Sequence, residues 1–169
     1  MSVINKPNVS RAIALSYEIL FIFMIAVTVF FLYCAFLTPM GIVGSAASLV
    51  STFVGAIMFL IAASLYRTRY ILTDAELVMR TTKLIGGNKT VSLKTVKSIE
   101  KTMIPFGIRL FGASFHGGHY HIPGLGRAFL SITNLDDGLL IKADHGNYII
   151  TPNNPLGFKE ILESRVEKS

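Results

Sequence analysis

The stretch that decides the fold runs from Ile19 to Tyr66 and reads ILFIFMIAVTVFFLYCAFLTPMGIVGSAASLVSTFVGAIMFLIAASLY. It contains no Asp, Glu, Lys, Arg or His. One membrane crossing takes about 20 apolar residues, and a single helix of this length would extend for roughly 70 Å. The run is divided at residues 38–41, Thr-Pro-Met-Gly, because Pro and Gly interrupt a helical pattern. The sequence therefore predicts two transmembrane helices, at about 12–37 and 42–66.

Positive charges flank this apolar run on both sides. Lys6 and Arg11 precede it, Arg67 and Arg69 follow it, and the loop between the helices carries no charge. Positively charged segments next to transmembrane helices stay on the cytoplasmic side of the membrane. We therefore expect a multi-pass protein of the plasma (inner) membrane with both termini in the cytoplasm and residues 1–11 as a cytoplasmic N-terminal segment. A cleaved signal peptide is the alternative, but its apolar region would be shorter and would not be followed by a second one.

The second helix carries a row of small residues that lie on one face: Gly44, Ser48, Ser51 and Gly55. In lipid, small residues let helices approach closely. This face either receives the first helix or docks another subunit. The short loop favours the first interpretation, since it keeps the helices adjacent. Glu18 is an intramembrane carboxylate, a residue type that often has a function, but no second ionisable group is present to pass a proton onward.

Beyond Arg67 the sequence changes to short runs of β-branched and aromatic residues separated by turn residues such as Gly86-Gly87-Asn88, a pattern typical of strands and hairpins. We expect strands at 69–73, 76–85, 90–93, 96–99, 119–122, 128–133, 139–143 and 148–151.

The chain is expected to end in an amphipathic helix. Asn153 or Asn154 can cap it, Pro155 suits its first position, and an apolar stripe follows. The stripe consists of Phe158, Ile161, Leu162 and Val166. The predicted fold is thus a membrane α-hairpin followed, over 67–169, by a mainly β domain. This domain would have about seven antiparallel strands in a curved sheet or partial barrel, with one C-terminal helix covering its open end.

Four segments resemble the pleckstrin-homology-like domains of prokaryotic membrane proteins, the bacterial PH domains. Residues 70–77, YILTDAEL, look like the family's opening hairpin, and residues 91–99, VSLKTVKSI, look like its I-x-L-x-x-I-x-x-I segment. Residues 112–120, GASFHGGHY, are similar to a glycine-rich segment of one bacterial branch. Residues 149–158, IITPNNPLGF, are similar to the closing strand and helix. The resemblance covers roughly residues 67–166.

The resemblance implies a non-catalytic domain without a cofactor that serves as an interaction or scaffolding module. Phosphoinositide-binding members have a basic first hairpin with a long loop. The corresponding turn here, residues 74–76, is short and acidic. Specific phosphoinositide recognition is therefore not expected.

The candidate metal ligands are His116, His119 and His121, which form an H-x-x-H-x-H cluster. In a strand, residues 119 and 121 share a face, and imidazole binds zinc or copper. A metal-binding accessory protein is thus an alternative function, although ordinary turn and strand histidines explain the cluster more simply. Ser114 beside His116 lacks a G-x-S-x-G framework, so no enzyme activity is expected.

Basic residues are concentrated next to the second helix. Residues 67–109 hold nine Lys or Arg against three acidic residues, whereas residues 110–169 hold five against six. Anionic headgroups attract such residues by about 1 kcal/mol each. The expected headgroup contacts are Arg67, Arg69, Lys83, Lys89, Lys94 and Lys97. Nucleic-acid binding is not expected, because the aromatic residues lie in apolar strand patterns and are not interleaved with basic ones.

Residues 103–111, MIPFGIRLF, are apolar and do not alternate cleanly. They form either a loop that covers the core or an exposed patch for contact with the membrane or with a partner. In the second case the partner-contacting residues are Ile104, Phe106, Ile108 and Phe111. The expected function is a non-enzymatic, membrane-anchored scaffold that binds a protein partner, or another copy of itself, at the cytoplasmic face. An anionic-lipid-binding module is a further alternative.

Overall fold

The computed structural model describes residues 2–37, 39, 41–82, 87–111 and 117–169, apart from the side chain of Phe111. The chain divides into two compact units. Arg11–Ala63 form the helical unit, and Met1–Ser10 together with Ser64–Ser169 form the β unit.

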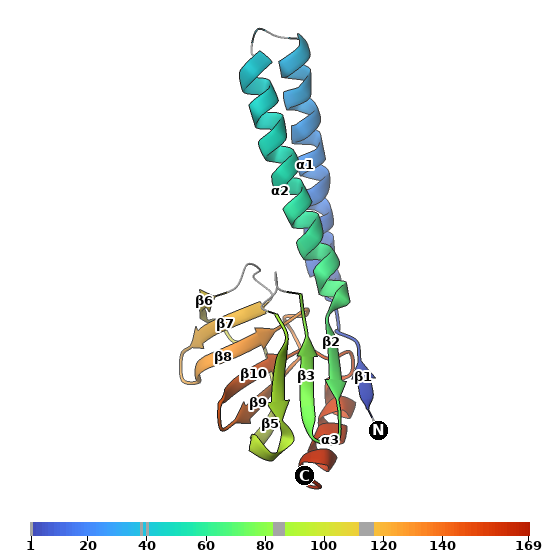
Figure 1. The fold of residues 1–169 in the computed structure, drawn as a ribbon, viewed down its shortest axis with the longest axis vertical. Helices are drawn as coiled ribbons and strands as arrows, with labels where there is room; N and C mark the ends of the chain where they lie inside the picture. Colours follow the sequence, from blue (N-terminus) through green and yellow to red (C-terminus); the bar gives the residue numbers. More distant parts are fainter. Residues whose placement is uncertain (1, 38, 40, 83–86, 112–116) are drawn as a thin grey trace. The chain divides into compact units, whose positions relative to one another are not determined.

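The helical unit is an antiparallel pair of helices, α1 (Arg11–Leu37) and α2 (Gly41–Arg67), of which the last turn of α2 belongs to the β unit (Figure 1). Both helices are long and apolar enough to cross a membrane. They begin and end within one residue of the predicted bounds. The helices are joined by a hydrogen bond of 2.9 Å between the hydroxyls of Thr28 and Ser51 and by ring packing of Phe21 on Phe59.

The first sheet of the β unit has the order β1-β2-β3-β4, with all neighbours antiparallel. Its strands are β1 (Val3–Asn5), β2 (Arg69–Leu72), β3 (Glu76–Arg80) and β4 (Lys89–Ser92). The first strand precedes α1 and the second follows α2, so the whole helical pair is inserted between two strands that are paired with each other.

The second sheet has the order β5-β9-β10-β8-β7-β6. Its strands are β5 (Val96–Thr102), β6 (Ile108–Phe111), β7 (Gly117–Ile122), β8 (Gly126–Ser131), β9 (Gly138–Ala143) and β10 (Gly146–Ile150). The short 3-10 helix η1 (Leu93–Thr95) leads from the first sheet into the second. All pairs are antiparallel except β8 with β10, which run parallel.

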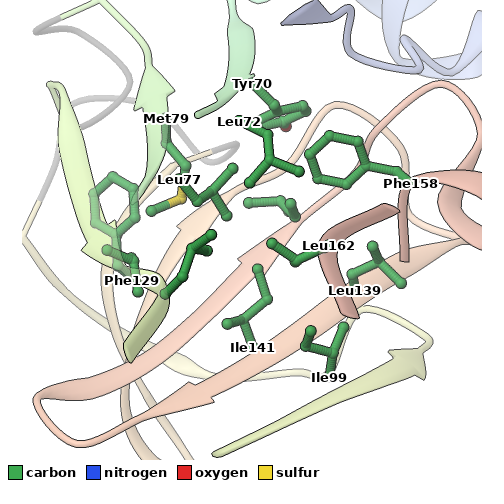
Figure 2. Packing of buried hydrophobic residues seen from close by; sticks show 13 residues of the cluster. Tyr70, Leu72, Leu77, Met79, Ile99, Phe129, Leu139, Ile141, Phe158 and Leu162 are labelled. Carbon is green, nitrogen blue, oxygen red and sulfur yellow. The ribbon is translucent and has the colours of Figure 1, made fainter. Parts of the chain in front are cut away.

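The main core lies between the two sheets and the C-terminal helix α3 (Pro155–Val166). Figure 2 shows Phe158 and Leu162 of α3 directed toward Leu72 of the first sheet and Leu139 of the second. The helix begins as predicted: the side chain of Asn154 accepts a hydrogen bond from Gly157 N, and Pro155 takes the first position. A second apolar cluster, which includes Leu130 and Ile149, lies on the opposite face of the second sheet, because neighbouring residues in a strand point to opposite sides.

The predicted sheet needs two corrections. The described residues form ten strands where about seven were expected, and they lie in two sheets that do not close into a barrel. Eight of the ten correspond to the eight strand segments predicted above, and the two that no predicted segment covers, β1 and β6, both lie at sheet edges. Edge strands need only one partner, so their residues lack the strict alternation by which buried strands are recognised.

The N-terminal segment is part of the β unit, where a separate segment was expected over residues 1–11. After β1, its backbone bonds to the residues that follow β8 and β10. Asn8 N donates to Thr151 O over 3.0 Å, and Ser10 N donates to Thr133 O over 2.8 Å. The buried hydroxyl of Thr133 donates to Asn8 O over 2.7 Å and also bonds to the Thr151 hydroxyl over 3.0 Å. The chain is therefore fixed to the β unit immediately before α1 begins.

Candidate interaction surfaces

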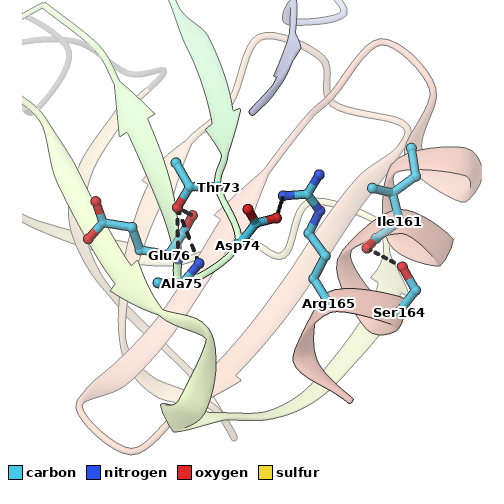
Figure 3. Close-up of polar contacts among 7 residues, drawn as sticks. All are labelled: Thr73, Asp74, Ala75, Glu76, Ile161, Ser164 and Arg165. Atoms are coloured by element: carbon cyan, nitrogen blue, oxygen red, sulfur yellow. Dashed lines mark hydrogen bonds and ion pairs between the residues drawn. The ribbon is translucent and has the colours of Figure 1, made fainter. Parts of the chain in front are cut away.

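The turn between β2 and β3, which the sequence predicts to be short and acidic, is closed by its own hydrogen bonds (Figure 3). The Thr73 hydroxyl accepts hydrogen bonds from the backbone N–H groups of Ala75 and Glu76. At its tip, Asp74 is paired with Arg165 of α3 over 2.8 Å. The Arg165 guanidinium is bonded to Asp74 and the backbone N–H groups of Ala75 and Glu76 are bonded to Thr73, so these donors are already used within the protein.

Part of the predicted basic surface gathers at one end of the first sheet. Arg69 lies opposite Arg80, and Lys89 lies opposite Met79 on the next strand. The guanidinium of Arg69 donates to the carbonyl oxygens of Tyr66 and Thr68, each over 2.6 Å, where α2 ends. Helix C-termini attract cations, so this contact stabilises the transition from α2 into β2. Arg67 is exposed at the same junction, and Arg80 is a member of this group that the sequence did not identify.

The remaining predicted basic contacts lie elsewhere. Lys94 in η1 and Lys97 in β5 follow the opposite end of β4, and Lys97 is paired with Asp144 over 2.8 Å. Lys83 lies outside the described residues. Among the described residues, the predicted basic contacts therefore fall at two ends of the first sheet and do not form one surface.

Lys89 also contributes to a contact between the two sheets. Its Nζ lies 5.7 Å from the centre of the Phe129 ring, and the His119 ring packs against the same phenyl ring at 5.3 Å. Partial burial, and then the charge of Lys89, lower the pKa of His119. His121 is exposed, and His116 lies outside the described residues. Among the residues that the structure describes, no group of three His, Cys, Asp or Glu side chains could hold a metal ion.

The apolar segment at 103–111 combines both predicted roles. Ile104 packs against the second apolar cluster, and its Cδ1 fills the space beside Gly138. Phe106 is 92% exposed and Ile108 is 68% exposed. Phe111 is the last residue of β6, and its side chain lies outside the described part of the structure. The segment thus covers the outer face of the second sheet with Ile104 and exposes Phe106 and Ile108.

A groove of about 400 Å³ lies between β5 and the C-terminal turns of α3. Its lining consists of Val96, Lys97, Ser98, Ile99, Glu163, Val166 and Glu167. β5 is an outer strand of its sheet, so one edge of its backbone has no neighbouring strand in the described part of the chain. The lining combines the apolar residues Val96, Ile99 and Val166 with the polar Lys97 and Ser98 of β5, and α3 adds two carboxylates.

The small face of α2 lies against α1. A Cβ added to Gly44 would come within 2.7 Å of the Ala35 backbone nitrogen, and one added to Gly55 would lie 3.3 Å from Met24 Cβ. Ser48 and Ser51 are each 5% exposed. Glu18 is exposed on α1.

The β5–α3 groove and the anchoring hydroxyls of Thr133 and Thr151 had no signal in the sequence. Strand edges and the partners of single threonines depend on which distant segments meet. The spacing of residues along the chain does not report such long-range pairings.

Taken together, these features define a class: a helical hairpin of membrane type carrying a two-sheet, pleckstrin-homology-like domain closed by a C-terminal helix. Residues 68–166 match the family model described as the bacterial PH domain, and the chain belongs to this family. This finding confirms the family that the four sequence segments indicated. No curated protein and no solved structure was found to match the chain.

Proposed function

We propose that this protein is a non-enzymatic, membrane-anchored PH module of the plasma (inner) membrane, with both termini in the cytoplasm, that binds an extended segment of a protein partner. The observation that carries the proposal is the groove between β5 and α3. The two helices supply the anchor, and the β unit supplies the binding surface.

The pairing of β1 with β2 supports an anchor that crosses the membrane twice. These strands exchange hydrogen bonds from Val3 opposite Leu72 to Asn5 opposite Tyr70, so they lie on the same side of any membrane. A chain that leaves one side of the membrane after β1 and returns to the same side before β2 must cross the membrane an even number of times. Two crossings need two apolar helices, and α1 and α2 have the required length.

The β5 edge supports an extended partner. Unpaired backbone N–H and C=O groups along a strand edge bind another strand by adding it to the sheet. In the groove, such a strand would place apolar side chains on Val96 and Val166 and basic side chains beside Glu163 and Glu167. A second β5 fits less well, because Lys97 and Lys101 would face like charges and the register irregularity between Val96 and Ser98 interrupts pairing.

The topology is tested by labelling single cysteines in a Cys34→Ser background. A membrane-impermeant reagent applied from outside intact cells should label Pro39→Cys in the connecting loop and should not label Lys168→Cys. The reverse pattern would overturn the proposed orientation. Protection of both positions would overturn the double crossing.

Partner binding is tested by placing a photo-crosslinking residue at Ser98, in the groove, and at Ser164, an exposed position on α3 outside the groove. In cells, position 98 should give a discrete cross-linked product that position 164 does not give, and Val166→Arg should abolish it. The absence of any product at 98, or equal products at both positions, would contradict the proposal. A product with the mass of two copies of this chain would show self-association and would also contradict it.

A further inference from the structure

Two cross-strand rows on β6, β7 and β8 share one face of the second sheet. In the first row His119 lies opposite Phe129, and in the second row His121 lies opposite both Ile108 and Arg127. Residues that are paired directly, and residues two apart in one strand, point to the same side of a sheet. Phe129 belongs to the main core between the two sheets. His119, His121 and Arg127 therefore lie on the inner face of the second sheet.

The two rows differ in how far the core covers them. Phe129 is 2% exposed, and His119 beside it is partly buried. His121 and Arg127, which are two residues farther along the same two strands, are exposed. The second row therefore lies at the margin of the core, where the inner face of the second sheet opens to solvent.

Lys89 reaches the same place from the first sheet. It is paired with the buried Met79, so its side chain points to the core side of β4, and its Nζ lies 5.7 Å from the centre of the Phe129 ring. The His119 ring lies 5.3 Å from the same centre. Paired residues have Cβ atoms about 5 Å apart, and residues two apart in a strand are about 7 Å apart. The four side chains thus gather beside Phe129 within roughly 10 Å of one another. They are Lys89, His119, His121 and Arg127.

The strands that carry these four side chains contain no carboxylate. Residues 77–99 and 101–135, which include β4, β6, β7 and β8, have no Asp or Glu. The next strand of the sheet, β10, is preceded by Asp144, whose carboxylate is bonded to Lys97. The cluster therefore carries an excess of positive charge, and such a cluster attracts a compact anion.

We propose that Lys89, His119, His121 and Arg127 form a binding site for the phosphate group of a phosphomonoester or of free phosphate. A guanidinium can hold two phosphate oxygens, and ammonium and imidazolium groups donate further charge-assisted hydrogen bonds. Ile108 continues the second row and is 68% exposed, so it offers an apolar contact to the rest of a phosphomonoester. The inference is independent of the β5–α3 groove and of the proposed membrane anchorage.

A phosphate group fits these residues better than a metal ion or an acidic peptide. Lys89 and Arg127 would repel a metal cation held by the two histidines. An extended acidic segment needs cations spaced along a strand, whereas these four side chains converge on one place. A phosphate dianion carries its charge and its acceptor oxygens within one compact group.

The test uses the full chain in nanodiscs of phosphatidylcholine, with histidine rings labelled for NMR and assigned through His119→Gln and His121→Gln. Inorganic phosphate should shift both signals saturably and should raise the pKa of His119, because the bound anion offsets the charge of Lys89. Arg127→Gln should weaken binding about tenfold through loss of a charge-assisted hydrogen bond. Arg80→Gln is the matched control, since Arg80 is exposed and follows Met79, so it points away from Lys89.

A second arm replaces free phosphate with phosphatidic acid in the nanodisc and distinguishes the two sources of the phosphate group. Shifts of both histidine signals with either probe support the site, and the probe that gives them identifies a soluble ligand or a lipid headgroup. No shift with either probe, or equal weakening by Arg127→Gln and Arg80→Gln, would overturn the proposal. Saturable shifts with zinc chloride and none with phosphate would identify a metal site and would also overturn it.

Discussion

The helical unit and the β unit bury opposite kinds of side chain. In the helical unit the largest apolar residues point outward, as Phe36 and Ile42 do, and the small residues Ser48 and Ser51 are buried. In the β unit Tyr70 and Phe158 are fully buried, and most charged residues lie outside. Outward-facing large apolar side chains suit the lipid environment proposed for the helical unit, whereas burial of the large apolar side chains suits water around the β unit. Among the described residues of the β unit, Met103, Phe106 and Ile108 are exceptions, because they are large, apolar and exposed.

The largest expected effect comes from removing one phenyl ring in each unit. Phe158→Ala should lower the free energy of unfolding of the β unit by about 3–5 kcal/mol, because it leaves a cavity in the core. Phe36→Ala, at an 81% exposed position, should change stability in detergent by less than about 1 kcal/mol. Denaturant titrations followed by tyrosine fluorescence measure both, since the chain has no tryptophan. Equal losses would mean that the two units do not differ in packing.

The next effect concerns close approach of the helices. Gly44→Val should separate α1 from α2, because a Cβ at this position meets the Ala35 backbone at 2.7 Å, and overpacking costs about 1–3 kcal/mol. The neighbouring Ser45→Val adds volume on the exposed side and should be tolerated. Disulfide formation between cysteines placed at Thr28 and Ser51 reports the helix separation. Undiminished disulfide formation in Gly44→Val would show that the helices do not need the small face.

A similar effect is expected where the N-terminal segment is fixed to the β unit. Thr133→Val removes the hydroxyl that donates to Asn8 O, and an unsatisfied buried polar group costs about 1–3 kcal/mol. Amide hydrogen exchange at Asn8 and Ser10 should become faster, while exchange in the core strand β9 changes less. Thr90→Val, at an exposed position on β4, is the control. Unchanged exchange at Asn8 would show that this hydroxyl does not hold the segment.

The smallest effect concerns surface charge on the β unit. The hydrogen bond from Lys97 to Asp144, together with the charge of Lys97, holds the pKa of Asp144 below its ordinary value. A depressed carboxyl pKa favours the folded state above the unfolded pKa, and this contribution is lost as the pH falls through the folded pKa. Lys97→Met should therefore raise the Asp144 pKa in an NMR titration. Because Asp144 is exposed, the thermal midpoint at neutral pH should hardly change.

Lys142→Met is the matched control for that titration. Lys142 donates to Glu100 and lowers the pKa of that carboxyl. Its removal should therefore move the Glu100 titration and leave that of Asp144 in place. If the pKa of Asp144 changed in both variants, the cause would be a rearrangement of the β unit and not the loss of one local ion pair.

The helices could be predicted to within one residue because the physics of a lipid environment is local: every residue of a spanning helix must suit the same solvent. The strands that contribute to the core, such as β2 and β9, were also predictable from their apolar and β-branched composition. Their pairing was not. That β8 and β10 run parallel, and that Val3–Asn5 extend the sheet beside Leu72, depend on residues far apart in the chain.

The candidate surfaces, like the fold, could be predicted only in part. Exposure of Phe106 and Ile108 was one of the two alternatives that the apolar run left open, because an apolar segment without alternation can either cover a core or form an exposed patch. The basic residues were predicted as one group from their sequence density. In the structure, Lys94 and Lys97 instead follow the end of β4 that is opposite to Lys89. Arg80 lies beside Arg69 because β2 and β3 pair these two residues. Density along the chain does not determine which end of a hairpin a residue occupies.

The pairing of β1 with β2 also orders the events of biosynthesis. The ribosome makes β1 first, then residues 6–68, and only then its partner strand. At about 5–20 residues per second, β1 waits several seconds, during which both helices emerge. On the proposed topology, a nascent chain whose second helix stalls in the membrane would leave the two strands in different compartments. Its first sheet would then keep an unpaired β2 edge exposed to proteases and chaperones. On the proposed topology, pairing of β1 with β2 would therefore require that both helices had first been inserted.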